Sequence, residues 1–110
     1  MTEWSISYKV ALAVDVVADL TGLDPAVIAK SNRRFGHIMA ARKLAIMLCR
    51  KFLGLQYKEI IGHINGDQST LVRHYRNGVV LVKGDPDYRL VWEMAADKVL
   101  SKIRERTSYV

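Results

Sequence analysis

The sequence predicts an all-α protein, a compact bundle of about five to six helices. Apolar residues recur at spacings of three and four over most of the chain, and Gly residues or Asp-Pro pairs separate these periodic segments. The β-branched run at residues 79–82 continues the apolar stripe of the segment before it, so we interpret it as helix too. With 110 residues, 50% hydrophobic and 25% charged, the chain has the composition of a single soluble globular domain, and we assign residues 1–110 to it.

Two helices are expected in the first part of the chain. The first begins near Ile6 and ends at Thr21-Gly22, and its apolar stripe is Ile6, Val10, Ala13, Val14, Val17 and Leu20. Asp24-Pro25 then starts a short helix, because Asp can cap a helix and Pro is favoured at the first helical position. The stretch from Lys30 to Gly36 is predicted to be a basic loop.

The middle of the chain predicts a helix-turn-helix. Residues 41–53 have an apolar stripe of helical period, with Arg42, Lys43, Arg50 and Lys51 on the opposite side, and Gly54 is placed to end this helix. Residues 57–64 supply about two further turns of helix. Asn65-Gly66 then form a tight turn, since both residue types tolerate positive φ.

Two long helices complete the prediction. The first is expected to start near Asp67, which can cap it, and to end at Gly84, with Leu71, Val72, Tyr75, Val79 and Val82 facing the core. Asp85-Pro86 starts the last helix in the same way as Asp24-Pro25. Its inward side chains are predicted to be Leu90, Val91, Met94, Val99, Leu100 and Ile103.

The polar residues and the charge distribution favour binding of double-stranded DNA. In DNA-binding helix-turn-helix proteins, the leading end of the second helix enters the major groove. That end carries the candidate base-reading residues Asp67, Gln68, Ser69 and Thr70. An ordinary capped helix with a solvated polar end has the same local pattern, but residues 25–58 contain no acid, which indicates a basic footprint. Contacts to phosphates or the minor groove are expected from Lys30, Arg33, Arg34, Arg42, Lys43, Lys58, Arg73, His74 and Arg76.

Two motifs carry a family resemblance. Residues 41–48 read Ala-Arg-Lys-Leu-Ala-Ile-Met-Leu, and residues 67–71 read Asp-Gln-Ser-Thr-Leu. They are similar to the Ala-Arg-x-x-Ala-x-x-Leu helix and the Asp-His-(Ser/Thr)-Thr-Val run of the C-terminal DNA-binding domain of the chromosomal replication initiator DnaA. With the basic loop and Asp85-Pro86, the resemblance spans about residues 6 to 104. It implies a Trp-repressor-like fold, a stand-alone DNA-reading domain that regulates replication initiation or transcription, and base reading by Asp67, Ser69 and Thr70.

The chain departs from the family pattern at three places. Gln68 stands where the family has His, so the recognised sequence is expected to differ from the initiator's box. The turn before Asp67 is one residue shorter than in the family and lacks its Arg. Gly36 aligns with the family's minor-groove Arg, for which Arg33 and Arg34 are the expected substitutes.

Other functions receive less support from the sequence. A phosphate-cradling Gly-rich loop, paired carboxylates and a Ser/His/Asp arrangement are lacking, so we do not expect an enzyme. Cys49 is interpreted as a core residue, and the three histidines lack metal-ligand spacing, so no metal and no cofactor are assigned. The single cysteine fits a reduced cytoplasmic location, with nucleoid association, and no membrane segment is expected.

The alternative function is a protein-interaction regulator, which engages replication-initiation proteins or competes with the initiator for its boxes. The sequence does not define an oligomeric state. Trp4, Trp92 and Tyr109 could form a dimer contact, but aromatic residues near chain ends more often complete a small core.

Overall fold

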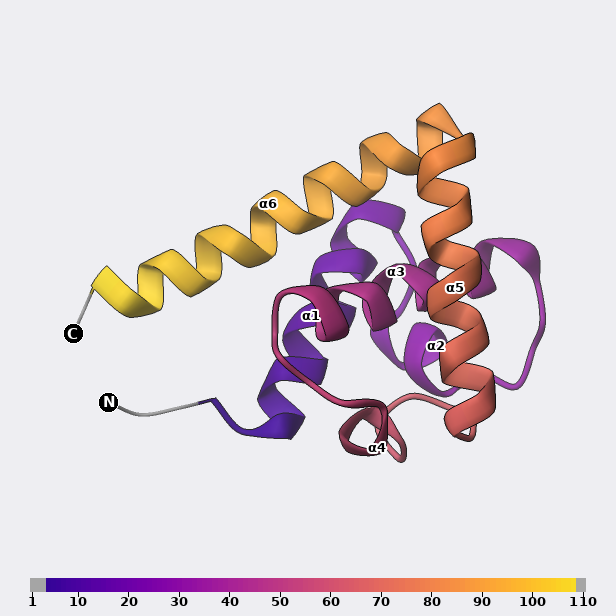
Figure 1. The fold of residues 1–110 in the computed structure, drawn as a ribbon, viewed down its shortest axis with the longest axis horizontal. Coiled ribbons are helices and arrows are strands. Elements are labelled where there is room, and N and C mark those ends of the chain that lie inside the picture. Colours follow the sequence, from indigo (N-terminus) through magenta and orange to yellow (C-terminus); the bar gives the residue numbers. More distant parts are fainter. Residues whose placement is uncertain (1–3, 109–110) are drawn as a thin grey trace.

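The computed structural model describes residues 4–108, which fold into six helices without a strand (Figure 1). The all-α prediction is therefore confirmed for this part of the chain. Tyr109 lies outside the described residues. The helices are α1 (Ile6–Thr21), α2 (Pro25–Lys30), α3 (Gly36–Lys51), α4 (Tyr57–Ile60), α5 (Gln68–Gly84) and α6 (Pro86–Ser108).

Most helix ends follow the predicted capping chemistry. The Asp24 carboxylate accepts a hydrogen bond from the Ala26 backbone N–H at 2.7 Å, and the Asp67 carboxylate accepts one from the Thr70 N–H at 2.8 Å. Gly54 follows α3 with a φ of 67°, a conformation that favours glycine. Helix α3 is the exception, because it begins at Gly36, earlier than the predicted residue 41, and its N-cap Phe35 offers no side-chain hydrogen bond.

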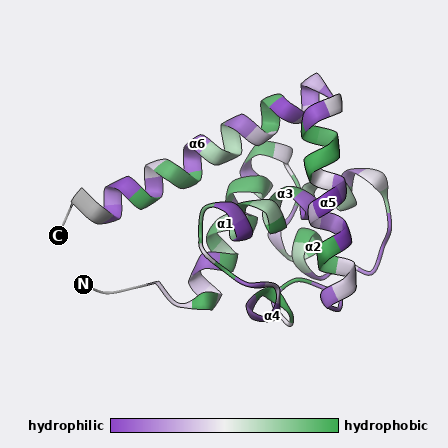
Figure 2. Cartoon of the chain, viewed as in Figure 1, coloured by the Kyte–Doolittle hydropathy of each residue, from purple (hydrophilic) through white to green (hydrophobic). Residues whose placement is uncertain are grey.

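Helix α3 lies at the centre of the molecule, with α1 on one side and α5 on the other, and α6 runs across α1 and α5 (Figure 1). Hydrophobic residues concentrate in α1 and α3, whereas hydrophilic and hydrophobic residues alternate along α6 (Figure 2). Cys49 is fully buried in this core, as predicted, and burial raises the pKa of its thiol to about 12. Trp92 stacks on Phe52 with ring centroids 5.7 Å apart, so this tryptophan completes the core.

Helix α5 approaches α3 closely because one residue at the contact has no side chain. A Cβ atom placed on Gly78 would lie 2.9 Å from both the sulfur and the terminal methyl of Met47. Met47 is itself only 1% exposed, so it has little room to move. Continuation of α5 through residues 79–82 is confirmed, and the segment is helical despite its three β-branched valines.

Some of the predicted helix bounds and packing are wrong. Helix α4 ends at Ile60 rather than near residue 64, because turns that include Gly62 at a φ of 90° follow it. On α6, Leu90 and Met94 are 58% and 46% exposed. The Tyr88 hydroxyl donates a hydrogen bond to the Ala40 carbonyl of α3 at 2.8 Å. The side of α6 that faces the core is therefore different from the predicted side. The residues of α6 that pack on the core are Tyr88, Val91, Trp92, Ala95, Val99 and Ile103.

None of the helices in the described part of the chain combines the length and the apolar character that crossing a bilayer requires.

Candidate functional site

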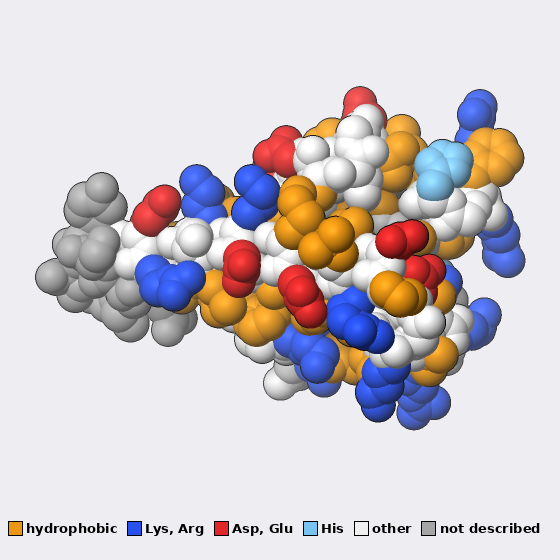
Figure 3. Space-filling view, turned by 90° about the horizontal axis from the view of Figure 1, so that it is seen from above, with side chains coloured by type: hydrophobic (Ala, Val, Ile, Leu, Met, Phe, Trp, Pro, Cys, Tyr) orange, Lys and Arg blue, Asp and Glu red, His pale blue; other side chains and the backbone are white. Residues whose placement is uncertain are grey.

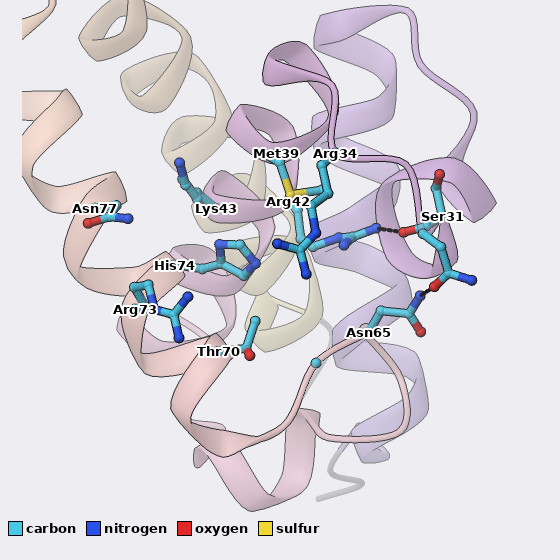
Figure 4. A pocket seen from close by; sticks show the side chains of 12 residues that line it. Ser31, Arg34, Met39, Arg42, Lys43, Asn65, Thr70, Arg73, His74 and Asn77 are labelled. Carbon is cyan, nitrogen blue, oxygen red and sulfur yellow. Dashed lines mark hydrogen bonds between the residues drawn. The ribbon is translucent and has the colours of Figure 1, made fainter.

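A groove of about 410 Å³ lies between α5, α3 and the loop that joins α2 to α3 (Figure 4). We call it the α5 groove. Helix α5 forms one wall, the loop forms the other, and α3 forms the floor between them. The lining residues include no acid; they are Ser31, Asn32, Arg34, Met39, Arg42, Lys43, Asn65, Gly66, Thr70, Arg73, His74 and Asn77.

Arg42 holds the loop in place and does not face solvent. Its Nε donates to the Ile28 carbonyl at 2.7 Å, and its Nη2 donates to the Ser31 carbonyl at 2.7 Å. Only 4% of the residue is exposed, and this burial lowers the pKa of the guanidinium. The Nε and Nη2 donors are bound by backbone carbonyls where α2 ends, which the planar fork of an arginine can bind together, so Arg42 has a structural role and its contact to a phosphate stays a prediction.

Asn65 provides a second connection, between the loop and the turn before α5. Its backbone N–H donates to the Ala29 carbonyl at 2.8 Å, and its side-chain amide donates to the Lys30 carbonyl and to the Asn32 side chain. The Lys30 ammonium in turn donates to the carbonyl of Gly62. In the predicted Asn65-Gly66 turn, only Gly66 adopts a positive φ. The two walls of the α5 groove are therefore joined at its lower end.

Three cations, Arg34, Lys43 and Arg73, surround His74 in the α5 groove (Figure 4). None of them forms a salt bridge with an acid among residues 4–106. The pKa of His74 is lowered to about 4, first because the ring is partly buried, and then because Lys43, Arg42, Arg73 and Arg34 oppose its protonation. His74 is consequently neutral at pH 7. It can donate a hydrogen bond to a phosphate, but it does not add a positive charge.

Lys and Arg side chains project from the right and lower right edges of the molecule in Figure 3, whereas along the arm on the left they are mixed with Asp and Glu side chains. Arg33 and Arg34 are both exposed on the loop. Lys58 is exposed on α4 and does not line the α5 groove.

The leading end of α5 presents a second, shallow hollow beside the α5 groove. It is lined by Gln68, Ser69, Val72, Arg73, Arg76 and Asn77. The Asp67 carboxylate is the helix cap, and its hydrogen bonds with Thr70 are the main cause of its lowered pKa. Thr70 is half-buried and lines the α5 groove, so Gln68 and Ser69 are the more outward of the four predicted base-reading residues.

Two residues beside the site were not assigned to it from the sequence, the half-buried Val72 and the exposed Phe35. Val72 fitted the inward stripe of α5 by its spacing, but it lines the outer hollow. Phe35 precedes α3, is 54% exposed and stacks on His37, with ring centroids 5.9 Å apart and an interplanar angle of 6°. An apolar residue directly after two arginines in a basic loop was the available signal for Phe35.

No group of three or more His, Cys, Asp or Glu side chains that could hold a metal occurs within the residues that the structure describes. Comparison of the chain with protein-family models, with curated proteins and with solved structures gave no match. The geometry of the α5 groove and the sequence motifs are therefore the basis for a functional proposal.

Proposed function

We propose that this chain binds double-stranded DNA, with the leading end of α5 in the major groove and one phosphate backbone in the α5 groove. The observation that carries this proposal is the open groove lined by Arg34, Lys43 and Arg73, which lacks acidic lining residues and lies beside an exposed polar helix end. A polyanion would supply negative charge to these three cations, none of which forms a salt bridge with an acid among residues 4–106.

Two kinds of contact to DNA are expected, to phosphates and to bases. Cationic side chains bind phosphates and fix the orientation of the protein, whereas side chains at the outer hollow contact base edges. Gln68 has the amide geometry for a bidentate contact to adenine, Ser69 can donate or accept a hydrogen bond, and Val72 can pack on a thymine methyl group. The specificity of the protein then depends on the first two turns of α5.

The resemblance of residues 41–48 and 67–71 to the DnaA C-terminal domain supports a regulatory role in replication initiation or transcription at the nucleoid. Gln68 replaces the family's His within the outer hollow, where it would contact a base. We therefore propose a recognised sequence that differs from the initiator's box.

Selection from a random pool of duplexes tests the proposal. We expect an enriched sequence, and affinity that falls with salt with a log-log slope of about −4 to −5, as about four to six phosphate contacts require. Gln68→Ala should relax specificity at one position, costing about 1 to 3 kcal/mol on the selected duplex, and Thr70→Ala should relax it less.

Arg33→Ala combined with Arg34→Ala should weaken binding to selected and scrambled duplexes alike, because phosphate contacts carry no sequence information. Lys98→Ala is the matched control, since Lys98 is exposed on α6 away from the α5 groove. A pool without any enriched sequence, together with binding that is insensitive to salt, would contradict the proposal.

A further inference from the structure

Phe35 is an exposed aromatic side chain whose position the fold does not explain. It lies outside the hydrophobic core and is 54% exposed, next to the exposed Arg33 and Arg34. One ring contact orients it, the parallel stack on His37 at 5.9 Å between centroids. A large apolar ring held in this way on a basic surface is available to a partner.

The residue is also unfavourable for the helix that it precedes. Phe35 occupies the N-cap of α3, a position that favours Ser, Thr, Asp or Asn because their side chains accept a hydrogen bond from the first turn. Phe35 makes no such bond, whereas Ser5, Asp24 and Asp67 do so at α1, α2 and α5. Phe35 therefore contributes neither to capping of α3 nor to packing of the core. Residues that go against local preference without such a compensation are typical of functional positions.

The position of Phe35 relative to the α5 groove indicates which part of a duplex it would meet. Its neighbour Arg34 lines one wall of the groove, and Thr70 and Arg73 of α5 line the other. If one phosphate backbone occupies the groove and α5 enters the major groove, the loop lies across that backbone. The face of a duplex across a backbone from the major groove is the minor groove.

We propose that Phe35 is an apolar wedge that enters the minor groove and inserts between two adjacent base pairs, which unstacks them and kinks the duplex. This inference rests on the proposed function. The ring has the chemistry of such wedges, which are apolar side chains that partly unstack a base step and bend DNA toward the major groove. His37 supports the ring, and Arg33 and Arg34 directly precede it in the loop, where they can contact the adjacent phosphates.

The experiment uses the full chain and the duplex that the wild-type protein selects. Bending is measured by energy transfer between dyes at the two duplex ends, and unstacking by the fluorescence of 2-aminopurine placed in turn at each step. With saturating wild-type protein, we expect a bend of about 20° or more and a fluorescence rise confined to one step beside the α5 site.

Phe35→Ser is the decisive variant, because the hydroxyl can cap α3 while the wedge is removed. We expect it to bind the duplex without the bend or the fluorescence rise, and to raise Tm by about 4 °C. Phe35→Leu, which keeps an apolar wedge, should retain most of both signals. Val80→Ser is the control for loss of an exposed apolar side chain, since Val80 is 67% exposed on α5.

The outcomes separate this inference from the proposed function. A bend and a fluorescence rise that survive Phe35→Ser, or a selected duplex that stays straight and stacked with wild-type protein, would overturn the wedge while DNA binding stands. Preference of the wild-type protein for single strands over duplex would overturn both the wedge and the proposed function. Failure to select any duplex would instead remove the proposed function itself.

Discussion

Helices α5 and α6 both carry exposed basic side chains, but the charges around them differ. Helix α6 also carries acids along its length, and Lys102 pairs with Glu105 at 3.8 Å. Helix α5 contains no acid, and Arg73 faces Arg34 and Lys43 across an open groove without a salt bridge in the described residues. The comparison teaches that the arrangement of positive charge, rather than its amount, marks the candidate interface.

The largest effect is expected from Arg42, the one groove arginine that is buried. Arg42→Met keeps the apolar stem but removes the donors to the Ile28 and Ser31 carbonyls, and should lower the free energy of unfolding by about 3 kcal/mol. Chemical denaturation measures this, with Arg34→Met as the exposed control, for which a change below about 0.5 kcal/mol is expected. Equal losses for the two variants would contradict the structural role of Arg42.

The comparison between α5 and α6 is tested most directly by two single substitutions. Arg73→Ala should weaken DNA binding about tenfold and reduce the magnitude of the salt slope by about one, because one phosphate contact is lost. Lys98→Ala on α6 should change neither quantity. Affinity and slope come from titrations of a labelled duplex at several salt concentrations, and similar losses at both positions would show that binding follows total charge alone.

The pKa of His74 depends on its burial and on the charges in the α5 groove. Because its pKa is about 4 in the folded protein and about 6.5 in an unfolded chain, the unfolded chain binds more protons between these values. The free energy of unfolding should therefore fall as pH drops from about 6.5 to about 4, and His74→Gln should reduce this dependence.

Bound phosphates would offset the surrounding cations, so DNA should raise the pKa of His74. Affinity for DNA should then increase as pH falls from the pKa of His74 in the complex towards its value of about 4 in the free protein, since the complex takes up a proton over this range. NMR titration of the His74 ring with and without duplex measures the change. An unaltered pKa in the complex would mean that no phosphate lies in the α5 groove.

The smallest effect is expected on the outer face of α6. Leu90→Ser should change the free energy of unfolding by less than about 0.5 kcal/mol, because Leu90 is 58% exposed. Val99→Ala, at a fully buried position of the same helix, should cost about 2 kcal/mol. Thermal denaturation compares the two variants, and a large loss for Leu90→Ser would indicate a contact absent from the isolated chain.

The helices, and most of their ends, could be predicted from the sequence, because capping residues, glycines and apolar spacing act locally. The rotation of each helix was harder to predict. Spacing alone placed Leu90 inward, but Leu90 is 58% exposed, and a hydrogen bond between distant residues, from Tyr88 to Ala40, accompanies the observed orientation of α6. The structural role of Arg42 could not be predicted for a similar reason, since only the folded chain shows that backbone carbonyls of α2 and the following loop lie within its reach.

The hydrogen bonds of Asn65 to Lys30 and Asn32 bear on any attempt to re-engineer this protein. They connect the loop to the segment that leads into α5. The distance between the two proposed contact regions, the loop and the leading end of α5, is therefore a fixed spacer. New side chains at residues 68–76 can be exchanged without changing that spacer. An extra residue inserted in the turn at 61–66 would alter it, and both contacts could then no longer fit the same stretch of duplex at once.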